Sequence, residues 1–239
     1  MMQRYLVIDF DSTLIRLEAL DELAKIALGN RSDKTELVEE IEAITKAGME
    51  GNISFAESLR RRLDLFNPSQ EDLDKLVSRL FENVTPSVVA AKDFIGIQSE
   101  NIYVISGGFK EYIVPVASSL GIIPDHILAN TFTTDREGNI TGFDADNPLS
   151  RQGGKEECLR SLRLSAPVVM VGDGYSDYLV RESGEATVFI AFVENAYRNK
   201  VVLRADHVAK NFQEVIAEVI READGALDEK ELIEATDQI

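Results

Sequence analysis

Two acidic and two hydroxyl side chains follow directly after the first apolar stretch of the chain. Residues 5–8 are typical of a buried strand, and residues 9–13 after them read Asp-Phe-Asp-Ser-Thr. Because successive strand residues alternate between faces, Asp9 and Asp11 are expected on the same side. Two like charges there repel unless a cation or a shared proton relieves them, so the pair is a candidate reactive site. A strand end followed by turn and helix-cap residues explains the same stretch.

A second apolar run, residues 102–105, leads into a serine and two glycines, Ser106, Gly107 and Gly108. The serine offers a hydroxyl, and the glycines leave backbone N–H groups unencumbered where a helix is expected to begin. Such an arrangement suits an anion. Taken alone, the segment is better explained by an ordinary glycine turn.

A third run, residues 168–171, leads into Asp173, which lies between two glycines, and Asp177 follows four residues later. Asp-Gly is a common turn, so this signal is weak by itself. Earlier in the chain, Lys155 follows two glycines at the expected start of a helix. A solvated surface charge is the ordinary explanation for such a lysine.

Together these segments predict one site, because ligands of open parallel sheets bind at the carboxyl ends of the strands. Four carboxylates, a serine and a lysine would meet there. Two like charges about 4 Å apart repel by roughly 4 kcal/mol at an effective dielectric constant near 20, so the carboxylates require a divalent cation. Oxygen ligands suit magnesium, which also favours phosphate-bearing substrates. With Ser106 and Lys155 holding a phosphate, the implied chemistry is phosphoryl transfer through an aspartyl-phosphate.

The pattern of apolar runs predicts an α/β fold with a Rossmann-like parallel sheet. Runs at 4–8, 102–105, 168–171 and 186–190 alternate with helical patterns, which is typical of a parallel sheet covered on both faces. Residues 14–82 show helical periodicity and no convincing strand, which indicates a helical insertion after the first strand. Pro86 is expected to open a helix, and residues 132–143 to form a hairpin appended to the sheet.

Composition limits the class of protein. The chain has 239 residues, 44% of them hydrophobic, with a net charge of −17 and one cysteine, Cys158. A single cysteine excludes a disulfide framework and a cysteine-rich metal site. The negative charge disfavours nucleic acid or an anionic membrane as partner, and no apolar run approaches the roughly 20 residues of a membrane span. The N-terminus does not resemble a signal peptide, so a cytoplasmic location is expected. Oligomeric state is left open.

These residues resemble the motifs of the haloacid dehalogenase superfamily of phosphotransferases, and within it the phosphoserine phosphatases, over about residues 3–222. The resemblance implies that Asp9 is the nucleophile and that Asp11 is the acid and then the base. It also implies magnesium on Asp9, the Asp11 backbone carbonyl and Asp173, with Asp177 in support. The matching residues are Asp9 to Thr13, Ser106, Gly107, Gly108, Lys155, Gly172 to Gly174, and Asp177.

The resemblance also implies a domain division and an activity. The core would comprise residues 1–13 and 83–222, the helical cap residues 14–82, and an acidic tail residues 223–239. The expected activity is magnesium-dependent hydrolysis of O-phospho-L-serine, the last step of serine biosynthesis. The alternative is the same chemistry on another small phosphomonoester, such as a phosphosugar or phosphohomoserine. An inactive phosphate-binding module would require a lost motif residue, and none is lost.

One arginine of the helical insertion is singled out by its position. Ser54 and Glu57 form a capping-box pattern, so a helix is expected to start at Phe55. On a 3.6-residue period Arg62 then shares a face with Phe55, while its neighbours at 60 and 61 point elsewhere. An arginine on an apolar stripe can bury its stem and keep its head in water, or it can bind a carboxylate. The resemblance implies the second role, on the substrate carboxylate.

The assignment of three other residues to the substrate pocket depends on the resemblance. It implies that Glu18 receives the substrate ammonium, although Glu18 is also a favourable first-turn acid of a helix. Met49 and Phe55 resemble the apolar lining of the pocket, and core packing explains both equally well.

Two departures from the family pattern concern the far side of the pocket. Ser176 stands where relatives usually have Asn or Thr, and it keeps a hydroxyl for substrate binding. A glycine-rich turn of relatives is replaced here by residues 191–194, which leaves the shape of one pocket wall open. Arg198 resembles a residue that pairs with the position of Glu18 in relatives, but a surface arginine explains it as well.

Overall fold

The computed structural model of the protein describes residues 4–49 and 52–221, with Met49 described through its backbone only. The predicted acidic tail at 223–239 lies outside the described residues. Six parallel strands form the central sheet in the order β3-β2-β1-β6-β7-β8. Their bounds are β1 Tyr5–Ile8, β2 Ile102–Phe109, β3 Ile127–Asn130, β6 Val168–Gly172, β7 Val188–Phe192 and β8 His207–Ala209. The predicted α/β class and the four predicted strands are confirmed, whereas β3 and β8 have no counterpart in the sequence prediction.

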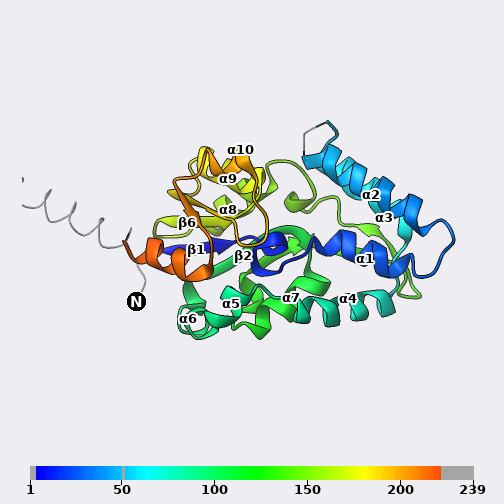
Figure 1. The fold of residues 1–239 in the computed structure, drawn as a ribbon, viewed down its shortest axis with the longest axis horizontal. Helices are drawn as coiled ribbons and strands as arrows, with labels where there is room; N and C mark the ends of the chain where they lie inside the picture. Colours follow the sequence, from blue (N-terminus) through cyan, green and yellow to red (C-terminus); the bar gives the residue numbers. More distant parts are fainter. Residues whose placement is uncertain (1–3, 50–51, 222–239) are drawn as a thin grey trace, which may run out of the picture.

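Helices cover both faces of the sheet, which explains why its strands are largely apolar. In β1 the side chains of Leu6 and Ile8 belong to one hydrophobic cluster and Val7 to the other, and all three are fully buried. Figure 1 shows α5, α6 and α7 on one side of the sheet and α8, α9 and α10 on the other. Their bounds are α5 Pro86–Ala90, α6 Lys92–Ile97, α7 Lys110–Ser119, α8 Gly154–Leu162, α9 Tyr175–Glu182 and α10 Asn199–Val202, and residues 212–221 are also helical. Pro86 is the first residue of α5, as predicted.

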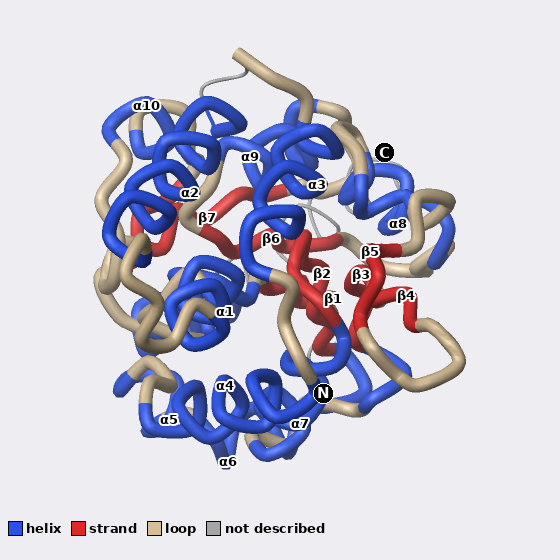
Figure 2. The backbone as a smooth tube through the Cα atoms, turned by 90° about the vertical axis from the view of Figure 1, so that its right-hand side faces the viewer, coloured by secondary structure: helices blue, strands red, loops and turns tan. Residues whose placement is uncertain are grey.

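The predicted helical insertion after β1 is present, and over residues 14–49 and 52–82 it contains four helices, which we call the cap helices. They are α1 Ala19–Ala27, α2 Lys34–Met49, α3 Phe55–Phe66 and α4 Gln70–Glu82. The chain enters and leaves this region through two paired segments: Ile15 and Val84 form an antiparallel bridge, and the Thr85 N–H donates to the Leu14 carbonyl at 3.0 Å. Figure 2 looks onto α1, α2 and α3, with the sheet behind them. The exact division into two domains remains a prediction.

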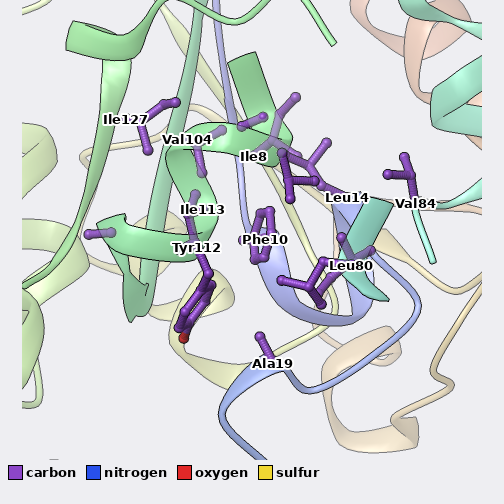
Figure 3. Packing of buried hydrophobic residues seen from close by; sticks show 14 of the residues in the cluster. Ile8, Phe10, Leu14, Ala19, Leu80, Val84, Val104, Tyr112, Ile113 and Ile127 are labelled. Carbon is purple, nitrogen blue, oxygen red and sulfur yellow. The ribbon is translucent and has the colours of Figure 1, made fainter. Parts of the chain in front are cut away.

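The cap helices share a hydrophobic core with the sheet. Leu80 of α4 and Leu14 belong to the same cluster as Tyr112 of α7, and all three are fully buried. Figure 3 shows Phe10 between the strand residue Ile8 and the cap residue Ala19. Because this core is continuous, the start of α1 is held close to the end of β1, where the acidic residues lie.

The predicted hairpin at 132–143 is present, but it is not part of the main sheet. β4 Phe132–Thr134 and β5 Ile140–Phe143 pair only with each other. The hairpin is attached through side chains instead: the Phe132 ring stacks on Phe109 with centroids 3.7 Å apart, and the Phe132 N–H donates to Glu111 Oε1 at 2.9 Å. Over residues 4–49 and 52–221, no helix combines the length and apolarity that crossing a bilayer requires.

Candidate active site

Asp9 and Asp11 lie in a tight loop rather than in a strand. β1 ends at Ile8, and residues 10–14 form a tight turn, η1 Phe10–Leu14, which the Ile15 N–H closes by donating to the Phe10 carbonyl at 3.1 Å. Just before this turn, Asp9 Oδ1 accepts from the Phe10 N–H at 2.8 Å. The prediction that strand alternation aligns Asp9 with Asp11 is therefore wrong, because neither residue lies in the strand. Asp11 is in an extended conformation and Ser12 has a φ of 51°, and this turn brings Asp11 Oδ1 to the Ala19 N–H at 2.8 Å. Asp11 is thus tied to the first residue of the cap.

Burial controls the protonation of Asp11. Desolvation, followed by the nearby charge of Glu18, raises the pKa of Asp11 well above its ordinary value. The N–H of Ala19 opposes this effect without cancelling it. Asp11 therefore holds a proton more readily than an ordinary aspartate, which suits a proton donor.

Lys155 joins two of the predicted acidic residues. Its Nζ lies 2.6 Å from Asp177 Oδ1 and 2.9 Å from Asp9 Oδ1, and the side chain is buried at the start of α8. Burial alone would lower the pKa of Lys155, but the carboxylates of Asp177 and Asp9 raise it above its ordinary value. The alternative of a solvated surface lysine is excluded, and the site contains a fixed positive charge.

Asp177 is held by the glycines around Asp173. Its Oδ2 accepts from the Gly174 N–H at 3.0 Å, and a Cβ on Gly172 would lie only 2.2 Å from the same oxygen. Glycine is therefore required at position 172 by close packing. Burial, followed by the charge of Asp9, raises the pKa of Asp177 to about 7. Asp173 is also buried, which raises its pKa, while its partner Arg198 opposes the rise.

Three buried carboxylates form a group that fits a metal ion. Within the described residues, Asp9, Asp173 and Asp177 each offer an oxygen within 4.8 Å of the others. A hard donor set of this kind suits a small divalent cation such as magnesium. The Asp11 side chain is not in this group, and the contribution of its backbone carbonyl stays a prediction.

Ser106, Gly107 and Gly108 belong to β2, which continues to Phe109 before α7 begins at Lys110. The expectation that a helix begins at these residues is wrong. The pairing with β3 is irregular between Ile105 and Phe109, so the strand departs from regular geometry at this point. The buried Ser106 Oγ accepts from the Gly108 N–H at 3.1 Å. The hydroxyl thus lies at the end of β2, beside the end of β1.

Phe55 of the cap covers this strand end. A Cβ on Gly107 would lie 2.8 Å from the tip of the Phe55 ring, so a side chain at 107 would displace it. α3 therefore reaches across to the end of β2.

Sequence reasoning missed Asn130, at the end of β3. Its Nδ2 donates to the carbonyl of Gly107 at 2.9 Å and to that of Leu149 at 3.1 Å, just before the helix that carries Lys155. The amide thus joins two elements expected to hold phosphate. A polar residue closing the apolar run 127–129 was the available signal.

Glu18 and Arg198 form a charged bridge beside Asp173. Glu18 Oε1 accepts from Ser12 Oγ at 2.9 Å and from Arg198 Nη2 at 3.2 Å, while Arg198 Nε donates to Asp173 Oδ2 at 2.6 Å. Burial, followed by the charge of Asp173, raises the pKa of Glu18 to about 7. Glu18 precedes α1 as its N-cap rather than lying in the first turn.

Arg62 lies on the buried face of α3, as predicted. Ser54 Oγ accepts from the Glu57 N–H at 3.2 Å and caps the helix that begins at Phe55. The Arg62 side chain is 9% exposed, whereas Arg60 and Arg61 are exposed. Its guanidinium is thus inside the cap and does not extend into solvent.

Two predicted pocket residues, Ser176 and Met49, are not shown to contact the site. Ser176 is exposed in the first turn of α9, and the side chain of Met49 lies outside the described residues. The interpretation of residues 191–194 as a turn is wrong for its first half, because Ala191 and Phe192 end β7 and are buried. Glu194 accepts hydrogen bonds from the hydroxyl and the N–H of Ser87, which joins this segment to α5.

Comparison with known proteins agrees with this geometry. The sequence model of the haloacid dehalogenase-like hydrolases matches residues 6–180. The chain is 32% identical to the chloroplastic phosphoserine phosphatase of Arabidopsis thaliana, over 87% of this chain and 69% of that protein. A phosphoserine phosphohydrolase-like protein from Francisella tularensis has a similar structure, with a TM-score of 0.79 and 30% identity over 90% of this chain and 98% of that one. A phospho-aspartyl intermediate analogue of phosphoserine phosphatase matches with a TM-score of 0.70 and 26% identity, over 90% and 97% of the two chains.

Proposed function

The chain belongs to the haloacid dehalogenase-like hydrolases and, among them, to the phosphoserine phosphatase family, and we propose that it hydrolyses O-phospho-L-serine to L-serine and phosphate. The observation that carries the choice of substrate is the buried position of Arg62, on the cap helix whose first residue, Phe55, covers Gly107. A guanidinium there supports binding of a carboxylate near the phosphate-binding end of β2. Glu18, at the start of the cap, supports binding of the ammonium.

The proposed chemistry uses two carboxylates in different roles. An Asp9 oxygen attacks phosphorus and forms the aspartyl-phosphate, while the bond from phosphorus to the seryl oxygen breaks. Asp11, whose pKa is raised by burial, gives its proton to that oxygen. Asp11 then takes a proton from the water that attacks phospho-Asp9, which releases phosphate and restores the enzyme.

Lys155 and Ser106 hold the transferring group in this proposal. The Lys155 ammonium is fixed 2.9 Å from Asp9 Oδ1, so it is placed to stabilise negative charge on the phosphoryl oxygens. Magnesium held by Asp9 and Asp173, with Asp177 in support, would supply further positive charge to the same oxygens when bound.

The substrate is tested by steady-state kinetics on a panel of natural phosphomonoesters. We expect phosphoserine to have the highest kcat/KM, ahead of phosphohomoserine and phosphosugars. A phosphosugar or phosphohomoserine at the top of the panel would reject phosphoserine in favour of the alternative. No phosphate release from any compound, an aryl phosphate included, would reject the phosphatase activity itself.

The metal preference follows from the small group of buried oxygens. Calcium takes more ligands than magnesium at longer distances, so we expect it to bind the carboxylates but to position the phosphate badly. After chelation and dialysis, activity should return with magnesium and not with calcium, and calcium should inhibit the magnesium-loaded enzyme. Full activity with calcium alone would contradict a site that requires magnesium geometry.

The proposal also includes the cellular role. Hydrolysis of phosphoserine would complete serine biosynthesis, and we propose a cytoplasmic location on the composition of the chain. Because the similar Arabidopsis protein is named as chloroplastic, fractionation of the native cells is the test that decides the compartment.

A further inference from the structure

The guanidinium of Arg62 is held by three cap helices. Its Nη1 donates to Asp21 Oδ1 of α1 and to Thr45 Oγ1 of α2, each at 3.3 Å, and its Nε donates to the Ser58 carbonyl of α3, also at 3.3 Å. Thr45 Oγ1 in turn donates to Asp21 Oδ1 at 3.0 Å. The side chains of Arg62 and Asp21 are 9% and 13% exposed.

These contacts use two of the three guanidinium nitrogens. They engage Nε and Nη1, while Nη2 donates no hydrogen bond within the part of the chain that the structure describes. A planar guanidinium fixed at two nitrogens presents its remaining N–H groups in a defined direction. Asp21 also supplies the opposite charge without which a buried arginine is costly.

We propose that Asp21 and Thr45 are positioning residues that determine specificity for substrates with a carboxylate. They fix Arg62 so that its Nη2 edge is presented to the substrate carboxylate, and Asp21 keeps the guanidinium buried when no substrate is bound. Neither residue touches the substrate in this proposal. The inference rests on the proposed function, since it specifies how one end of phosphoserine is selected.

The test compares phosphoserine with phosphoethanolamine, which lacks only the carboxylate. Asp21→Asn retains an oxygen for the Thr45 hydroxyl and for Arg62 but removes the charge. A small misplacement of a binding group can cost up to about 10²-fold, so we expect kcat/KM on phosphoserine to fall by roughly tenfold to 10²-fold, mainly through KM. On phosphoethanolamine the change should be within about threefold. Thr45→Val should shift the preference in the same direction, and Thr45→Ser, which retains the hydroxyl, should not.

The neighbouring residue Glu22 offers a matched control. Glu22 is also a buried carboxylate of α1, but it pairs with Arg79 of α4 at 2.9 Å, away from Arg62. Glu22→Gln therefore removes an equivalent charge and weakens cap packing, so it should affect both substrates equally. If Asp21→Asn gives the same equal losses, or no loss, the positioning role is wrong. A gain on phosphoserine would also overturn it, since Asp21 would then compete with the substrate for Arg62.

Two further measurements separate this inference from cap stability and from the proposed function. In the Arg62→Ala background, Asp21→Asn should cause no further loss on phosphoserine, and an undiminished loss there contradicts the proposal. If thermal melting shows that Asp21→Asn does not fold, the positioning role is tested by comparing Thr45→Val with Thr45→Ser on the two substrates. If the wild type does not hydrolyse phosphoserine, the proposed function fails, and the same variants are compared on phospholactate and ethyl phosphate. Absence of any carboxylate preference there overturns the inference as well.

Discussion

Asp9→Asn is expected to abolish phosphate release while the protein stays folded. An amide oxygen is a poor nucleophile toward phosphorus, and loss of the nucleophile costs roughly 10⁶-fold in another covalent hydrolase. The amide oxygen can still accept from the Phe10 N–H, which Asp9 Oδ1 does at 2.8 Å. Asp9 also raises the pKa values of Asp177 and Asp173 by charge repulsion, and removing that charge relieves the repulsion. Stopped assays for phosphate and a thermal melt together test this prediction.

The neighbouring carboxylate provides the comparison for this experiment. Asp11→Asn should reduce turnover by about 10²- to 10⁴-fold rather than abolish it, because it removes a proton donor and not the attacking atom. Acid-quenched wild-type enzyme should carry phosphate on Asp9, and the Asp9→Asn variant should carry none. Wild-type phosphate release by Asp9→Asn, or a loss smaller than about tenfold in Asp11→Asn, would contradict the assigned roles.

Arg62→Ala is expected to remove most of the preference for phosphoserine over phosphoethanolamine. In a closed site, an analogue without the carboxylate leaves Nη2 of Arg62 without a partner, and rejection of this kind reaches roughly 10⁴-fold. The buried position of Arg62 supports discrimination of this kind, because a solvated arginine would discriminate very little. The variant should therefore lose catalytic efficiency on phosphoserine far more than on phosphoethanolamine. Kinetics of both proteins on both substrates measure the effect.

Arg60 on the same helix gives the matched control. It is exposed, so Arg60→Ala should leave the ratio of the two efficiencies unchanged. Equal losses of Arg62→Ala on both substrates would show that Arg62 acts through cap stability, since its guanidinium also joins α1 and α2. No loss on either substrate would mean that Arg62 does not contact the substrate carboxylate.

Local patterns in the sequence determined the strands that carry the chemistry and the helix face that carries Arg62. An apolar run followed by a polar residue marks a buried strand, although β2 continues past Ser106 to Phe109, and these signals depend only on residues a few positions apart. The N-cap Ser54 and the 3.6-residue period place Arg62 inward for the same reason. The short edge strand β8 gave no such signal, because its three residues are too few to establish a pattern.

Only the tertiary structure decided which of these residues meet. The sheet order places β1 between β2 and β6, so the loop that carries Asp9 lies between the ends that carry Ser106 and Asp173. Strand alternation could not predict the position of the Asp11 side chain, because β1 stops at Ile8. The positive φ of Ser12 then turns the chain so that Asp11 meets the Ala19 N–H. The partners of Arg62 and Arg198 come from other helices and loops, and pairing across such sequence distances is set by how the elements pack, which no local pattern encodes.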